Sequence, residues 1–192
     1  YDLIAFEWVA KTADMLVVCR SGYTESLLRL VTLFKDLSKT VIFDVDDLVF
    51  DPAYSMQLAL ALGQDPSNAQ TLDYWHAYTS RMREAALLCD GITTTNLYLA
   101  KIATQSLGMN ASVIPNSLNT GQILASQNIY KAKEANSFAR DSRFTIGYFS
   151  GSPSHKKDFE VIANALRLLL EQRAFVDVII AGYIEIDESL SK

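Results

Sequence analysis

Four carboxylates follow a short apolar run near the middle of the N-terminal half. Asp44, Asp46, Asp47 and Asp51 come directly after or close to the run 41–43. An apolar, β-branched run of this kind predicts a buried parallel strand, and open α/β sheets bind ligands beyond the carboxyl ends of such strands. Because unpaired carboxylates are costly to bury, we expect these side chains at a rim that faces water, a cation or ligand hydroxyl groups.

A second group of chemically suited residues lies between a strand-like and a helix-like run. It comprises Ser150, Gly151, Ser152, Lys156 and Lys157. A glycine and small serines before a helix start leave backbone N–H groups and the positive end of the helix dipole facing an anion, and the lysines add charge. This pattern predicts a diphosphate site. The alternative is an ordinary strand-to-helix turn, since neither G-x-G-x-x-G nor P-loop spacing is present.

The elements that must position the first group alternate regularly along residues 1–120. Strands are predicted at 14–20, 40–45, 91–96 and 111–115, and helices at 24–36, 56–62, from a cap at Asn68 or Thr71 to residue 88, and 97–105. Alternating strands and helices predict a doubly wound parallel sheet of the Rossmann type, an α/β fold, over residues 1–120.

The second group belongs to a new cycle of elements. Residues 121–141 are rich in Gln, Asn, Lys, Ala and Ser, lack periodicity, and are interpreted as a linker with a helical turn within 129–139. Beyond it, a strand at 143–149, a helix from Asp158 and a strand at 175–181 predict the β-α-β beginning of a second Rossmann-type domain at 142–192. A doubly wound domain usually has about five or six strands, so we expect the chain to be a fragment or another segment to complete this domain.

Composition limits the classes of function. Lys+Arg 17 against Asp+Glu 22 gives a net charge of -5, and no basic stripe is visible, which argues against a nucleic-acid partner. No apolar run approaches the roughly 18 residues of a membrane span, and no signal peptide pattern opens the chain. Cys19 and Cys89 lie in or beside apolar runs, which favours buried thiols in a reducing compartment over a disulfide.

Three segments resemble family 4 glycosyltransferases, which have the two-domain GT-B architecture. Residues 43–51 (FDVDDLVFD) are similar to the DIDDLLF strand end of bacterial polysaccharide and O-antigen glycosyltransferases. Residues 113–119 (VIPNSLN) are similar to the VIPNGVD segment that closes the first domain, and residues 146–159 (IGYFSGSPSHKKDF) to the opening of the nucleotide-sugar domain. The order and spacing also match.

The resemblance implies transfer of a sugar from a nucleotide-diphosphate-sugar donor to a glycan or lipid-linked acceptor, with retention, no metal and no cofactor. It places Asp44, Asp46 and Asp47 in the catalytic cleft, and matches Lys157 to a lysine that contacts the diphosphate. The family's preceding arginine falls within 151–153, where this sequence has none. A cytoplasmic location, with peripheral membrane association as a variant, is also implied.

The sequence also allows other interpretations of these carboxylates and of the function. Asp46 or Asp47 could cap the turn that follows the strand. The chain could be a non-catalytic glycosyltransferase-like binding module. Asp44 and Asp46 also resemble the D-x-D motif of haloacid-dehalogenase-like phosphatases, although Leu48 and the absence of a later Gly-Asp-x-x-x-Asp motif depart from that family.

Overall fold

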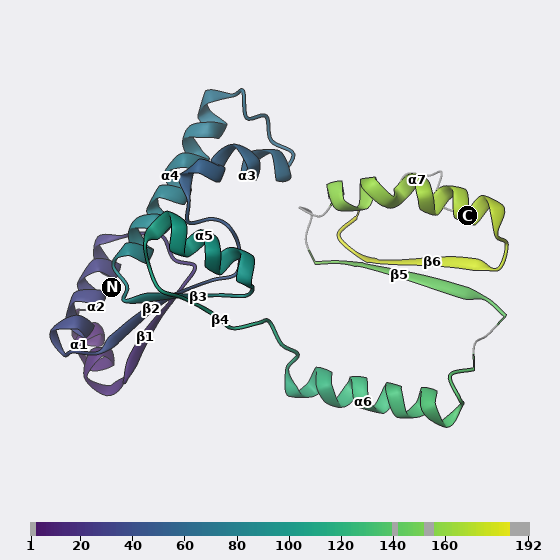
Figure 1. Ribbon diagram of the computed structural model, residues 1–192, viewed down its shortest axis with the longest axis horizontal. Helices are drawn as coiled ribbons and strands as arrows, with labels where there is room; N and C mark the ends of the chain where they lie inside the picture. Colours follow the sequence, from purple (N-terminus) through teal and green to yellow (C-terminus); the bar gives the residue numbers. More distant parts are fainter. Residues whose placement is uncertain (1–2, 140–141, 152–155, 185–192) are drawn as a thin grey trace. The chain divides into compact units, whose positions relative to one another are not determined.

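The structure is a computed structural model that describes residues 3–139, 142–151 and 156–184. It divides into two compact units, Tyr1–Ser117 and Leu118–Lys192, which are called unit 1 and unit 2 below. Figure 1 traces the elements of each unit.

Unit 1 is built on a four-stranded sheet in the order β1-β2-β3-β4. The strands are β1 (Met15–Cys19), β2 (Thr40–Val45), β3 (Gly91–Thr94) and β4 (Ala111–Val113). All three pairings are parallel, so the four carboxyl ends lie along one edge of the sheet (Figure 1). The expected parallel α/β sheet is thereby confirmed.

Helices precede and connect the strands. They are α1 (Leu3–Thr12), α2 (Glu25–Asp36), α4 (Ala69–Leu87) and α5 (Leu97–Leu107). Polar side chains cap three of them, because Thr24, Asn68 and Asn96 each accept a backbone N–H of the first helical turn. Gly108, with φ 67°, ends α5 in the left-handed conformation that glycine adopts readily. Asn68, not Thr71, therefore caps α4.

One face of the sheet carries the core of unit 1. Val41, Phe43 and Val45 alternate along β2 toward this face and are at most 1% exposed. The residues that α2, α4 and α5 contribute to the same cluster are Val31 and Phe34 of α2, Met82, Ala85 and Ala86 of α4, and Ile102, Ala103 and Leu107 of α5. Each such burial of a Val or Phe side chain contributes about 1.5–3 kcal/mol, so three helices are fixed to one side of the sheet.

The opposite face is open at β1, where Met15 and Val17 are 51% and 54% exposed. Each new strand adds on the same side of the previous one, and right-handed crossovers then place the connecting helices on one face. Among the described strands there is accordingly no reversal of order of the kind that defines a doubly wound sheet. Strand patterns predict that strands exist; they do not predict on which side the next one adds.

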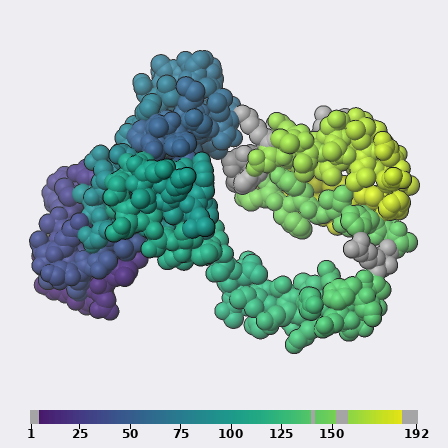
Figure 2. All heavy atoms as spheres, in the orientation of Figure 1, coloured from purple at the N-terminus to yellow at the C-terminus, as the bar shows by residue number. Residues whose placement is uncertain are grey.

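A helical excursion separates β2 from β3. It contains η1 (Pro52–Tyr54) and α3 (Ser55–Ala61), which packs on α4. The Ser55 and Thr79 hydroxyls, both at most 1% exposed, lie 3.0 Å apart and link the two helices. With 19 residues, α4 is about 28 Å long, so its N-terminal half extends past the carboxyl edge of the sheet. Figure 2 shows this excursion, in blue, as a lobe of unit 1.

The segment interpreted as a linker contains a longer helix than expected, α6 (Thr120–Ala135). Asn119 and Gln122 form a reciprocal capping box at its start, with N–H to oxygen distances of 2.9 and 3.0 Å. No residue of α6 is buried. No buried apolar face therefore marks this helix, and the features of the sequence that favour it are the capping box and the residues Ala, Gln, Lys and Glu.

The rest of unit 2 is a β-α-β unit made of β5 (Phe144–Ser150), α7 (Lys156–Gln172) and β6 (Val176–Gly182). The strands are parallel, as expected. Tyr148 packs edge-on against Phe159 of α7, with 5.0 Å between ring centroids. Because α7 begins at Lys156, Asp158 lies inside its first turn and is not the cap that the sequence suggested.

Candidate active site

The register of the sheet brings four polar side chains into one row near the carboxyl edge of unit 1. Cys19 pairs with Asp44, Asp44 with Thr93, and Thr93 with Ser112. Successive side chains of a strand point to opposite faces of the sheet, and Asp44 lies between the buried Phe43 and Val45. Asp44 and the residues paired with it therefore have their side chains on the open face. The sequence located Asp44 at a strand end, and its neighbours Cys19 and Thr93 lie 25 and 49 positions away.

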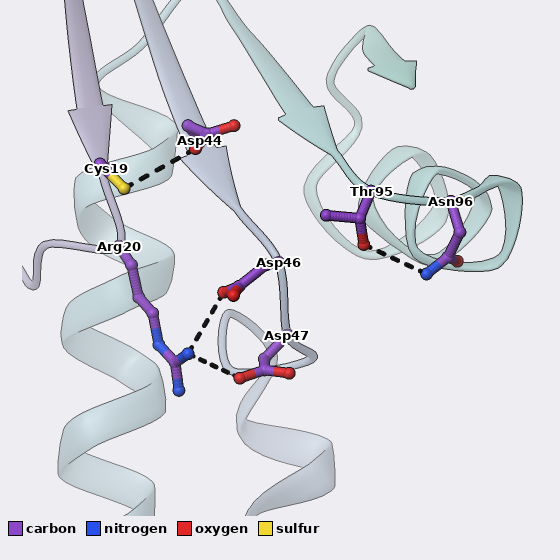
Figure 3. A network of polar contacts seen from close by, with 7 residues as sticks. All are labelled: Cys19, Arg20, Asp44, Asp46, Asp47, Thr95 and Asn96. Atoms are coloured by element: carbon purple, nitrogen blue, oxygen red, sulfur yellow. Dashed lines mark hydrogen bonds and ion pairs between the residues drawn. The ribbon is translucent and has the colours of Figure 1, made fainter. Parts of the chain in front are cut away.

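Asp44 is held on both sides by this row. The Thr93 hydroxyl donates to Asp44 Oδ1 over 2.6 Å, and the Cys19 thiol donates to Oδ2 over 3.7 Å. Desolvation and then the nearby Asp44 charge raise the pKa of Cys19. The contact between Cys19 and Asp44 is drawn in Figure 3.

Cys19 is exposed, which corrects the expectation of a buried thiol, whereas Cys89 is buried as expected. Both are free thiols, as expected.

Asp46 and Asp47 point toward Arg20, which follows β1 (Figure 3). Arg20 Nη1 lies 3.2 Å from Asp46 Oδ1 and 2.6 Å from Asp47 Oδ2. The carboxylate side chains remain 56% and 57% exposed. The pair is therefore oriented by a cation while it stays open to a ligand.

Arg20 is the residue of this cluster that sequence reasoning missed. Its φ of 40° lies in the left-handed region, where a non-glycine residue is disfavoured, and its backbone N–H donates to the Asp44 carbonyl over 2.8 Å. Burial alone would lower the pKa of Arg20, but interactions with Tyr78, Asp47 and Asp46 raise it. The feature of the sequence that could have identified Arg20 is its position directly after an apolar strand.

The structure does not support the interpretation that Asp46 or Asp47 caps the turn after β2. Their side chains pair with Arg20, and Asp51 takes the capping role, because its Oδ1 accepts the Ala53 N–H over 3.0 Å at the start of η1. Asp51 is thus a local structural residue. Asp44, Asp46 and Asp47 remain together at the carboxyl edge.

The third strand end contributes Thr95 and Asn96. Asn96 Nδ2 donates to Thr95 Oγ1 over 3.3 Å, and Asn96 Oδ1 accepts the Leu99 N–H over 2.9 Å (Figure 3). Asn96 therefore starts α5, and its amide is oriented by the cap.

In unit 2, the expected anion-binding residues lie at the carboxyl end of β5 and the start of α7. Ser150 is the last residue of β5 and is 9% exposed. A Cβ placed on Gly151 would meet no described atom within 4 Å. Lys156 and Lys157 are the first two residues of α7, while Ser152 lies outside the described residues.

Gly182 closes this edge from the neighbouring strand and was not singled out from the sequence. Its φ is 109°, and a Cβ there would lie 1.8 Å from the Ser150 carbonyl oxygen. The close backbone approach of β6 to Ser150 thus requires glycine at position 182.

Within the described ranges, no group of three His, Cys, Asp or Glu side chains is arranged to hold a metal ion. None of the described helices is both long and apolar enough to cross a bilayer. No protein-family model matches the chain, and no curated protein matches its sequence.

Proposed function

We propose that this protein acts in glycosyl transfer, moving a sugar from a nucleoside-diphosphate-sugar donor to a glycan or lipid-linked acceptor. The observation that carries the proposal is the Asp46–Asp47 pair, which Arg20 orients at the open carboxyl edge of a parallel sheet. The similarity of residues 43–51, 113–119 and 146–159 to family 4 glycosyltransferases supports it. We further propose the GT-B architecture and a site of action at or near the cytoplasmic membrane face.

In unit 1, exposed carboxylates suit recognition of sugar hydroxyl groups. A hydroxyl that donates to Asp46 or Asp47 forms a charge-assisted hydrogen bond, which fixes the direction of its oxygen lone pairs. Fixing that direction lowers the entropic part of the barrier to attack on the donor sugar. Arg20 limits the movement of both carboxylates, so less ordering is needed when the acceptor binds.

In unit 2, the end of β5 at Ser150 and the start of α7 suit the diphosphate of the donor. Backbone N–H groups at the start of α7 and the helix dipole stabilise negative charge, including the charge that develops as the nucleoside diphosphate leaves. The lysines at positions 156 and 157 add positive charge to the sequence at the start of α7.

The test is release of nucleoside diphosphate from UDP-, GDP-, ADP- and dTDP-sugars in the presence of mixed oligosaccharide and prenyl-phosphate-linked acceptors. Asp46→Asn and Asp47→Asn should each reduce release roughly a hundredfold or more and leave the melting temperature nearly unchanged, because exposed ion pairs contribute little to stability. Asp14→Asn, at an exposed position before β1, is the matched control and should keep full activity.

Two results would count against the proposal. One is turnover that survives in folded Asp46→Asn and Asp47→Asn variants. The other is magnesium-dependent release of phosphate from p-nitrophenyl phosphate that is lost in Asp44→Asn, which would instead support the phosphatase reading.

A further inference from the structure

A cavity of about 360 Å³ lies beside the Arg20 cluster, between α4 and the turn that follows β1. Its lining residues are Gly22, Tyr74, Ala77, Tyr78, Arg81 and Met82. The volume is near the lower end of the range of small-ligand pockets, about 300–1,000 Å³. Gly22, which lines the cavity, follows Arg20 closely in the chain, and Tyr78 of the lining contributes to the raised pKa of Arg20, so the cavity lies near the paired carboxylates.

Aromatic rings provide one wall of the cavity. Tyr74 and Tyr78 lie one helical turn apart on α4, with ring planes 17° apart and centroids separated by 6.4 Å. Tyr74 is 60% exposed. The negative face of such a ring attracts the C–H groups on the apolar face of a pyranose ring, so the wall offers a platform on which a sugar can lie flat.

Hydrogen bonds hold the turn after β1, which supplies Gly22 to the lining, against α4. Arg81 Nε and Nη2 both donate to the Tyr23 carbonyl over 3.1 Å, and the Tyr23 N–H donates back to the Arg81 carbonyl over 2.7 Å. A Cβ on Gly22 would lie 3.4 Å from Arg81 Cβ. The turn after β1 is therefore fixed to α4, and the cavity is formed before a ligand arrives.

The charges around the cavity favour an uncharged ligand. Arg81, the charged residue among the six that line the cavity, already directs Nε and Nη2 to the Tyr23 carbonyl. The nearby Arg20 guanidinium already pairs with Asp46 and Asp47. A phosphate would have to compete with these carboxylates and would meet their repulsion. Hydroxyl groups can instead donate to the carboxylates and accept from the arginines.

We infer that this cavity binds a pyranose ring, so that the acceptor in the proposed reaction is the sugar end of a glycan and not a lipid phosphate. The inference rests on the proposed function for the role of the sugar as acceptor. The sugar ring stacks on the exposed Tyr74, which Tyr78 supports from one turn along α4, and its hydroxyls are directed to Asp46 and Asp47.

The test is a titration of the ¹⁵N-labelled protein with the methyl glycosides of glucose, galactose, mannose and N-acetylglucosamine, followed by amide chemical shifts. At least one glycoside should shift the amides of Gly22, Ala77 and Tyr78. Tyr74→Ala should weaken that binding roughly three- to tenfold. Tyr130→Ala, which removes an exposed tyrosine of α6 in unit 2, should leave it unchanged.

Farnesyl phosphate is titrated in parallel. Shifts at the same amides with farnesyl phosphate but with no glycoside would overturn the inference in favour of a lipid phosphate. No shift with any glycoside, up to the solubility limit, would overturn it as well. If the protein turns over sugar nucleotides but binds no glycoside, only this inference is overturned. If it binds a glycoside but turns over no sugar nucleotide, the proposed function is overturned and the cavity remains a sugar-binding site.

Discussion

Arg20 determines how the carboxylates of the candidate site are presented. It comes from the end of β1, while Asp46 and Asp47 come from the end of β2, and the parallel pairing of the two strands brings them together. Its left-handed backbone conformation, with φ 40°, turns the chain out of the strand at this point. A strained residue at a cluster of charged side chains is a feature typical of functional sites.

The cost of this conformation can be measured with two variants. Arg20→Ala and Arg20→Gly both remove the ion pairs, but only glycine adopts positive φ without strain. We expect the Gly variant to be more stable than the Ala variant by about 1 kcal/mol in urea denaturation. Equal stabilities, or a more stable Ala variant, would contradict a strained backbone at position 20.

At the scale of elements, the turns that end strands carry most of the site. In unit 2, the contact of Gly182 with Ser150 is the tightest, since a Cβ at position 182 would lie 1.8 Å from the Ser150 oxygen. A Cβ on Gly151, one residue beyond Ser150, would meet no atom of the described residues within 4 Å. The two glycines therefore form a matched pair for mutation.

Gly182→Ala should destabilise unit 2 by about 2–3 kcal/mol or more, because both a clash and a positive φ must be relieved. Gly151→Ala should change stability by less than about 0.5 kcal/mol. Thermal unfolding of the two variants, followed by circular dichroism, compares them. Similar melting temperatures for both would show that the edge of β6 is not fixed as described.

The turn before β3 gives a pH-dependent contribution to stability. Asp90 accepts the Val41 N–H over 2.8 Å and pairs with Lys35 over 3.3 Å. The bond from Val41 is the main cause that lowers the pKa of Asp90 below its ordinary value of 3.8. A lowered carboxyl pKa stabilises the fold above the unfolded-state pKa, and this stability is lost as the pH falls through the folded-state value.

Asp90→Asn should therefore cost about 1 kcal/mol at neutral pH, and the difference from the wild type should shrink as the pH falls below about 4. Urea denaturation at several pH values measures it. A difference that stays constant through the acid range would show that Asp90 is not held as described.

The elements could be predicted largely because their signals are local. The apolar run of β2 and the cap at Asn68 depend on residues close together in the sequence. The pairing of Arg20 with Asp46 and Asp47 could not be predicted, because it depends on which strands are neighbours. The length of α6 was missed, because an exposed helix needs no apolar stripe.

At the scale of the whole molecule, each unit has polar groups where its parallel strands end. Unit 1 has the carboxylates with Arg20 and the nearby cavity, and unit 2 has the end of β5 and the start of α7. The division of labour proposed above assigns the acceptor sugar to unit 1 and the donor diphosphate to unit 2. Both local motifs could be recognised from the sequence, whereas the cavity could not, because its residues come from separate segments.

Binding of a nucleoside diphosphate to unit 2 tests the account most directly. In a titration of the ¹⁵N-labelled protein with UDP and GDP, we predict that at least one shifts the amides of Ser150, Gly151 and the first turn of α7, while the Arg20 and Asp46 amides stay unchanged. Gly151→Val should abolish these shifts without unfolding unit 2, because its Cβ has space in the absence of a ligand. No shift at these amides with either nucleotide, or shifts that persist in Gly151→Val, would contradict the account.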